Sequence, residues 1–345
     1  METVGKNLPG ILLCVGIAII SIYLGGQIPL VGGPVFALML GIVLNLFLKS
    51  DPLLHWGLNF TSKKLLKFAI ILLGFGLSIG QILEVGKFSL VVMVFTLTAA
   101  FGFGYLFGKL FKMDWRLSSL ISAGTGICGG SAIAALSPVI AADDSQVTYA
   151  ISATFIFDIV MIILFPIMGR ALGLSDLAYG LWTGTAVNDT SSVVAAGFAF
   201  SNAAGNFATI VKLTRTLSII PTVVLFSYIA QRMKQRELQA KSKAGAAPAK
   251  VSLGAIFPYF IVFFIVAAIV NSVGLVPSGI GLFLKGASKF LMVMALAAIG
   301  LKTDLGKVKD AGFLPMLHGF IISALVVVVS LGVQVFLNQL RSLSR

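Results

Sequence analysis

Charged residues are scarce in this sequence, at 11% of 345 residues. A soluble protein carries about 25% charged residues, because its surface must be hydrated. The mean hydropathy is correspondingly high, at +1.04. The shortage of charge excludes an ordinary soluble domain and indicates a chain that is mostly embedded in a membrane.

Residues that commonly carry enzyme chemistry are also scarce. The two cysteines, Cys14 and Cys128, lie in separate apolar runs and have no metal-ligand spacing. The two histidines, His55 and His318, are far apart, and no nucleophile–base pair is evident. The sequence has neither a phosphate-binding lysine loop nor a dinucleotide fingerprint. We therefore expect no bound cofactor, no metal and no enzymatic activity.

Long apolar runs account for most of the chain. A helix needs about 20 apolar residues to cross a bilayer. Eleven runs approach this length, at 8–24, 30–48, 65–83, 88–108, 117–142, 147–168, 177–200, 206–230, 252–272, 286–303 and 312–338. They predict an all-α polytopic membrane protein with about eleven transmembrane helices, forming one domain over residues 1–345. The charged, then small and flexible stretch at 231–250 predicts a cytoplasmic loop.

The net charge of +13 supports this topology. If the N-terminus is cytoplasmic and every run crosses, most Lys and Arg residues fall in cytoplasmic segments, as the positive-inside rule expects. The excess of positive charge then sets orientation and attracts anionic lipid. Because no basic stripe is interleaved with exposed aromatic residues, we expect no nucleic-acid partner.

Glycines interrupt the fifth apolar run, where residues 124–131 read Gly-Thr-Gly-Ile-Cys-Gly-Gly-Ser. A helix that faces lipid cannot give up backbone hydrogen bonds, so such a break must be buried in protein or line a wet cavity. Transporters use broken helices to aim N–H groups and the positive end of a half-helix at an anion. The candidate substrate-binding residues of this run are Thr125, Gly126, Cys128, Gly129, Gly130 and Ser131.

Polar residues interrupt the seventh run in the same way, at Asn188, Asp189, Thr190, Ser191 and Ser192. An ionised aspartate at the bilayer centre costs about 2.5–3.5 kcal/mol even on insertion scales, so Asp189 should face a cavity or a partner. The neighbouring hydroxyl and amide groups suit an oxyanion or a cation, or bonds to adjacent helices. The first four residues are candidates for substrate binding, and Asp189 is also a candidate for ion coupling.

Lys212 and Arg215 lie three residues apart in the eighth run and share one helix face. Beside the N-terminus of a broken helix they would hold a small oxyanion, since arginine grips two oxygens at once. Alternatively, they form ion pairs with Asp158 or Asp189 that lock two helices together. Asp158, midway along an apolar run, suits either a proton carrier or a structural bond to a neighbouring helix.

A weak internal similarity joins residues 64–78 and 289–302, and the predicted topology runs them in opposite directions. This is the relation expected of inverted repeats.

With these motifs the sequence resembles the YeiH-type family of bacterial membrane proteins, which is assigned to sulfate export. The resemblance is carried by 124–135 with Pro138, Asp189 and Thr190 with 193–197, and 212–215. It implies a secondary transporter of the bacterial inner membrane, related to the bile-acid and cation/proton antiporter folds. Those folds pair two inverted five-helix repeats around crossed, interrupted helices. The implied substrate is sulfate, sulfite or a sulfonate, and a homodimer is expected by fold analogy.

Two positions depart from the family pattern. Asn188 stands where the family often has His, and Ser192 where it tends to have Gln. Without an imidazole beside Asp189, proton coupling through that pair is less well supported. Asp158 is not part of the family pattern, so its role rests on its position alone.

The sequence therefore predicts an oxyanion exporter that works by alternating access. The backbone around 126–131 and the hydroxyls of Thr190 and Ser191 would bond the substrate, while Lys212 and Arg215 supply positive charge. One alternative is a cation/proton antiporter that uses Asp158 and Asp189. An anion channel, a membrane-embedded enzyme and a sensor without flux are the others.

Overall fold

The computed structural model describes residues 2–28, 33–48, 52–240, 259–303 and 312–343. Within these ranges every regular element is a helix and there is no strand, which confirms the all-α prediction. Six helical segments among them are long and apolar enough to cross a membrane: Leu8–Gln27, Ile82–Leu110, Ser145–Ala171, Asn202–Met233, Gly279–Leu301 and Phe313–Leu337. They lie in α1 (Glu2–Gln27), α5 (Ile79–Leu110), α8 (Asp144–Ala171), α11 (Asn202–Thr216) with α12 (Ile219–Ala240), α15 (Ser278–Leu301) and α17 (Phe313–Leu343).

Shorter helices cover the second, third and ninth apolar runs. They are α2 (Gly33–Leu48), α14 (Tyr259–Ser272), and the consecutive α3 (Pro52–Asn59), η1 (Phe60–Leu65) and α4 (Leu66–Gly74). The predicted loop at 231–250 begins later than expected, because α12 continues to Ala240. The rest of that loop, and the first residues of the run at 252–272, lie outside the described residues.

The fifth apolar run folds back on itself. It forms α6 (Trp115–Ala123), the π-helix η2 (Gly124–Cys128) and α7 (Gly130–Leu136). The Nε atom of Arg116 donates to the carbonyl of Ile140 at 3.0 Å, although 24 positions separate them. In a straight helix this separation would be about 36 Å. Residues 115–140 are thus a re-entrant hairpin, hairpin 1, and not the single crossing predicted for 117–142.

The seventh apolar run also folds back on itself. Its arms are α9 (Asp176–Ala186) and α10 (Thr190–Phe200), joined by a tip in extended conformation at Val187 and Asp189. The Tyr179 ring stacks on Phe200 with centroids 3.9 Å apart, and the Tyr179 hydroxyl donates to the carbonyl of Ala196 at 3.0 Å. These contacts require antiparallel arms, so residues 176–200 form hairpin 2 and replace the crossing predicted for 177–200.

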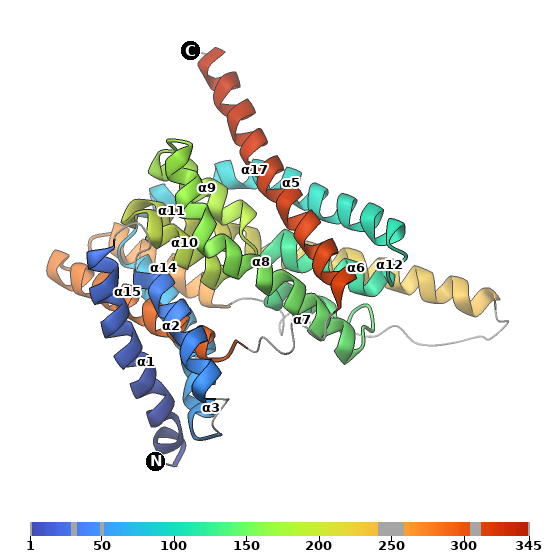
Figure 1. Ribbon diagram of the computed structural model, residues 1–345. Coiled ribbons are helices and arrows are strands. Elements are labelled where there is room, and N and C mark those ends of the chain that lie inside the picture. The colour runs from blue at the N-terminus through green and yellow to red at the C-terminus, as the bar shows by residue number, and fades with distance from the viewer. Residues whose placement is uncertain (1, 29–32, 49–51, 241–258, 304–311, 344–345) are drawn as a thin grey trace.

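The long helix α8 joins the two hairpins and sets their relative orientation. Its 28 residues span about 42 Å. Hairpin 1 ends at one end of α8 and hairpin 2 begins at the other, so the two hairpins point toward each other from opposite sides (Figure 1). Each hairpin is followed by a long helical segment, α8 or α11–α12. The sequence similarity between residues 64–78 and 289–302 is not part of this inverted arrangement. Those two segments lie in α4 and α15, which pack against each other.

Glycines let α11 lie close along both arms of hairpin 2. A Cβ on Gly184 of α9 would stand 2.6 Å from Cβ of Val211, and one on Gly197 of α10 would stand 2.9 Å from Cα of Gly205. Such close approach is the usual role of small residues between membrane helices. It places the C-terminal end of α11 beside the tip of hairpin 2.

The helices form two bundles (Figure 1). The α2/α15 bundle contains α1, α2, α3, η1, α4, α14 and α15, and the hairpin bundle contains both hairpins, α5, α8, α11, α12 and α17. Small residues line part of the boundary, where Ala195 and Ala199 of α10 pack in one apolar cluster with Leu38 and Ala297 of the other bundle. The hairpin tips lie inside the hairpin bundle, in contact with α8 and α11.

Candidate functional site

The tips of the two hairpins meet at Gly129 and Asp189. Gly129 has a left-handed φ of +65°, and a Cβ there would lie 3.0 Å from both Cβ and Oδ1 of Asp189. Both the turn and the contact therefore require glycine at this position. The sequence-predicted breaks at 124–131 and 188–191 are thus brought together, as expected for one common site.

Lys212 of α11 bonds both tips at once. Its ammonium donates to the carbonyl of Ile127 in hairpin 1 at 2.7 Å and to the carbonyl of Val187 in hairpin 2 at 3.0 Å. The side chain is completely buried. A single charged group therefore joins the two hairpins across the site.

Arg215, one turn further along α11, makes similar bonds. Its Nε donates to the carbonyl of Gly126, one terminal nitrogen donates to the carbonyl of Thr125, and the other donates to Val187 at 3.4 Å. These carbonyls belong to the last residues of helical arms, which have no partner within their own helix and carry the negative end of its dipole. The two cations thus neutralise the carbonyl ends of the arms.

This differs from the sequence expectation, which placed the cations beside a helix N-terminus. The cause is the hairpin geometry, because each tip holds the C-terminal end of one arm next to the N-terminal end of the other. The alternative of ion pairs with Asp158 or Asp189 is not seen either. Within the described residues, the donors of Lys212 and Arg215 bond backbone carbonyls.

Asp158 of α8 holds the tip of hairpin 2 from the other side. Its two carboxylate oxygens each accept a backbone N–H at 2.9 Å, from Asn188 and from Asp189. The side chain is 1% exposed. Asp158 therefore supplies acceptors to an extended segment that has none of its own, which is the structural bond considered from the sequence.

Asp189 begins α10. Its Oδ2 accepts the backbone N–H of Ser191 at 2.8 Å and the Ser191 hydroxyl, which is the usual bonding of a helix N-cap. Asp189 is only partly buried, in contrast to Asp158.

One side of the tips is accessible. Gly130, Asp189 and Thr190 are partly exposed and Ser131 is exposed, whereas Thr125, Gly126, Cys128, Gly129, Asn188 and Ser191 are buried. Gly130 and Ser131 are the first two residues of α7, and the first N–H groups of a helix have no acceptor within that helix. The accessible donors and Thr190 thus lie next to the point where the tips touch.

The side chain of Asn188 points elsewhere. Its amide nitrogen donates to the Thr154 carbonyl of α8 at 3.4 Å and to the Ser323 hydroxyl of α17 at 3.2 Å. The Thr125 hydroxyl also lies 3.4 Å from the Ser323 hydroxyl. Sequence analysis missed Ser323. The feature of the sequence that could have indicated it is Ser330, which lies seven residues later on the same face of α17 and bonds Thr185 of hairpin 2.

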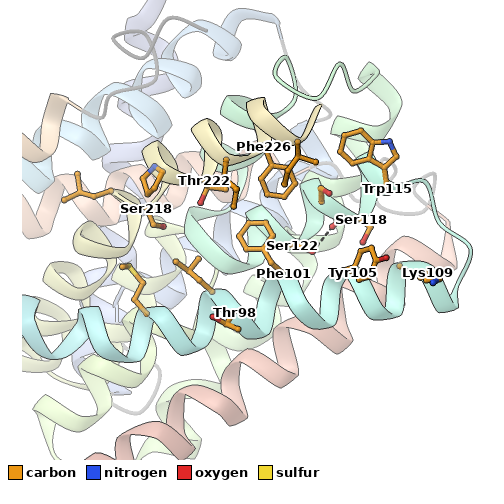
Figure 2. A pocket seen from close by; sticks show the side chains of 18 of the residues that line it. Thr98, Phe101, Tyr105, Lys109, Trp115, Ser118, Ser122, Ser218, Thr222 and Phe226 are labelled. Atoms are coloured by element: carbon orange, nitrogen blue, oxygen red, sulfur yellow. Dashed lines mark hydrogen bonds between the residues drawn. The ribbon is translucent and has the colours of Figure 1, made fainter. Parts of the chain in front are cut away.

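A groove of about 1000 Å³ lies beside hairpin 1, between α5, α6 and the α11–α12 junction (Figure 2). Its lining is mostly apolar, and Phe101 of α5 meets Phe226 of α12 with ring centroids 5.4 Å apart. The lining includes Lys109, near the end of α5, and Thr214 and Ser218 near Arg215. None of the candidate substrate residues lines it, so the groove and the tips are separate features.

The geometry defines a polytopic α-helical membrane protein built around two opposed re-entrant hairpins. The chain belongs to the family described as Conserved hypothetical protein 698, whose model matches residues 9–319. It is similar to a UPF0324 membrane protein of Clostridium tetani, with 58% identity over 98% of this chain and all of the relative. UPF0324 membrane proteins of Streptococcus pneumoniae (strain R6) and Fusobacterium nucleatum are 43% and 40% identical, each over 99% of the relative and over 98% and 96% of this chain.

Proposed function

We propose that this protein is a secondary transporter that exports a small oxyanion, such as sulfate, sulfite or a sulfonate, by alternating access. The observation that carries the proposal is the junction of two opposed hairpin tips with two buried cations. The resemblance to YeiH-type exporters at the same residues adds to it. On this proposal the protein is not an enzyme, and it lies in a bacterial inner membrane with a cytoplasmic N-terminus.

The proposed substrate site is the accessible side of the tips. The arms α7 and α10 both begin there, so the positive ends of two helices converge on one point. The N–H groups of Gly130 and Ser131 and the hydroxyl of Thr190 would donate to the oxyanion. Lys212 and Arg215 lie directly behind the tips and add positive potential in a buried region, where charge interactions are strong.

The cations also retain bonding capacity. An ammonium group has three N–H donors and a guanidinium group has five. Lys212 donates two bonds and Arg215 three to the tip carbonyls. The remaining donors, one on Lys212 and two on Arg215, are left for an anion bound at the tips.

The proposed motion is a displacement of the hairpin bundle against the α2/α15 bundle. The boundary contains small side chains, including Ala195 and Ala199, which offer little resistance to sliding. Because the hairpins approach from opposite sides, each would shield the substrate from one side of the membrane. Movement between two packed arrangements is the usual basis of alternating access.

Flux measurements in liposomes test the proposal. Purified protein should take up labelled sulfate or sulfite saturably, and Arg215→Ala should abolish uptake while Arg215→Lys retains part of it. Arg232→Ala is the control, since it removes the same charge from an exposed part of α12. Uptake that does not saturate would favour a channel, and proton flux that depends on cations and is lost in Asp158→Asn would favour an antiporter. Absence of any oxyanion flux would overturn the proposal.

A further inference from the structure

We propose that the groove between α5, α6 and the α11–α12 junction binds an anionic phospholipid. The acyl chains of the lipid would lie along the apolar length of the groove, and its phosphate would face Lys109 at one end. The proposal does not rest on the transport function, since it concerns a surface that is separate from the hairpin tips.

The groove is long and mostly apolar. Along α5 its lining runs from Leu90 to Lys109, which is a helical distance of about 28 Å. A lipid chain reaches about 15 Å, half the hydrocarbon core of a bilayer, so the groove is long enough to hold one. Apolar space of about 1000 Å³ does not stay empty in a packed protein, and it does not attract water. The occupant must therefore be apolar over most of its length.

The hydroxyl groups of the lining do not favour a small anion instead. Four of them donate to nearby backbone carbonyls at 2.6–3.0 Å, from Ser118, Ser122, Thr214 and Ser218. A hydroxyl has only one hydrogen to donate, so these four have none left for a free oxyanion. The middle of the groove thus suits hydrocarbon.

One end of the groove has the character of a membrane interface. Figure 2 shows Lys109, Tyr105 and Trp115 near this end, and Ser218 toward the other. Among the described residues of the lining, Lys109 is the one that carries a charge. Tyrosine and tryptophan rings prefer the level of the lipid headgroups, and a lysine ammonium can donate to a phosphate. A ligand with one anionic head and a long apolar tail matches this distribution.

The charges around this end favour an anionic lipid over a zwitterionic one. Lys112 follows Lys109 closely in the chain, and the Arg116 guanidinium lies 5.7 Å from the centroid of the Trp115 ring. The opposing charge is Asp114, whose carboxylate accepts the N–H of Arg116 at 2.8 Å. Three cations thus stand against one carboxylate between residues 109 and 116. On the proposed topology this end is cytoplasmic, where the membrane surface carries anionic lipid.

Quenching of Trp115 fluorescence by brominated lipid tests the inference on the full-length protein. Trp115 lines the groove and is partly exposed, and bromine on an acyl chain quenches an indole on contact. The Trp56→Phe protein is reconstituted in phosphatidylcholine that contains increasing fractions of brominated phosphatidylglycerol or of brominated phosphatidylcholine. The same titrations with Trp56→Phe and Trp115→Phe combined are subtracted, which isolates the signal of Trp115.

We expect half-maximal quenching at an about fivefold lower mole fraction of the brominated phosphatidylglycerol. This ratio corresponds to the about 1 kcal/mol that one lysine contributes near an anionic lipid surface. Lys109→Ala should make the two lipids equal, and Lys109→Arg should keep the difference. Thr222→Phe places a ring in the groove and should weaken quenching by both lipids.

Lys112→Asn is the matched control. It removes the same charge from an exposed residue outside the described lining, and asparagine tolerates the left-handed backbone at this position, where φ is 54°. The control should keep the preference for phosphatidylglycerol. A single gel-filtration peak and an unchanged unfolding temperature show that each variant is folded.

Equal quenching by the two lipids in the parent protein would overturn the inference, as would a preference that Lys109→Ala leaves unchanged. A preference that Lys112→Asn removes as fully as Lys109→Ala would indicate attraction to the surface in general, and it too would overturn the inference. Quenching by neither lipid would mean that a second copy or another protein segment fills the groove, which is the third contradicting result.

Discussion

Substitution of Asp158 distinguishes most clearly between a structural role and a proton-carrying role for this side chain. In the structure its two carboxylate oxygens accept one backbone N–H each, from Asn188 and Asp189. Asparagine at this position has one acceptor oxygen, and its NH₂ group would face the second N–H. Asp158→Asn therefore removes one of the two bonds that hold the extended tip of hairpin 2.

The size of the effect follows from these bonds. A hydrogen bond to a charged group contributes about 1.5–3 kcal/mol. Replacing the buried carboxylate also removes the cost of keeping a charge out of water, which offsets part of the loss. We expect a net loss of about 1–3 kcal/mol in the free energy of unfolding. Asp158→Ala removes both acceptors and should destabilise the protein further.

The assay is thermal unfolding in detergent, followed by tryptophan fluorescence, alongside flux in liposomes. Asp176→Asn is the control, because Asp176 also lies in hairpin 2 but accepts the Ser201 hydroxyl at the far end from the tip. Asp158→Asn should be less stable than this control, and any transport that remains should keep the pH dependence of the wild type. An Asp158→Asn protein of full stability whose flux has lost its pH dependence would refute the structural role.

Three further predictions concern other parts of the fold. Gly129→Ala should separate the hairpin tips, because a residue with a Cβ rarely adopts φ +65° with ψ −134°, at a cost of about 1–3 kcal/mol, and the new methyl would meet Asp189. Normal flux in a folded Gly129→Ala protein would contradict the tip contact. Ala195→Trp should block movement between the bundles and abolish flux while oxyanion binding, measured by equilibrium dialysis, persists; undiminished flux would exclude this boundary as the moving surface. Asp143, the N-cap of α8, has a pKa held below its usual value by the Ser145 hydroxyl and the Gln146 N–H. Its contribution to the stability of the fold is therefore present above the unfolded-state pKa, and it is lost as pH falls through the lower folded-state pKa. Asp143→Ala should therefore lower the unfolding temperature at pH 7 and have no effect in strong acid, and an equal effect at both pH values would contradict the capping role.

Hydropathy predicted the helices well because the physical demand is local. Every backbone group in lipid must be bonded within its own segment, so apolar runs become helices wherever they occur. Glycines at 124–130 and polar residues at 188–191 correctly marked the interruptions. Those features depend on a few neighbouring residues, and the sequence displays them directly.

The reversal of the two runs could not be predicted in the same way. A run of about 25 apolar residues has the same composition whether it crosses or folds back. The difference lies in distant contacts, such as Arg116 with the Ile140 carbonyl and Tyr179 with Phe200. For the same reason the sequence placed Lys212 and Arg215 near the correct residues but at the wrong end of the helical arms.

The polar face of α17 was missed because its serines are spaced among Val, Leu and Ile residues. Ser323 acquires its importance from Asn188 and Thr125, which come from both hairpins. These contacts become visible only where α17 meets both hairpins.

The central claim is that the accessible side of the hairpin tips binds an oxyanion. Thiol labelling tests it directly in a Cys14→Ala, Cys128→Ala protein that carries either Ser131→Cys or Thr190→Cys. Sulfate or sulfite should slow labelling of both cysteines saturably, at the same concentration for each, and Arg215→Ala should remove this protection. Labelling rates that no oxyanion changes, in variants that remain folded, would contradict the claim.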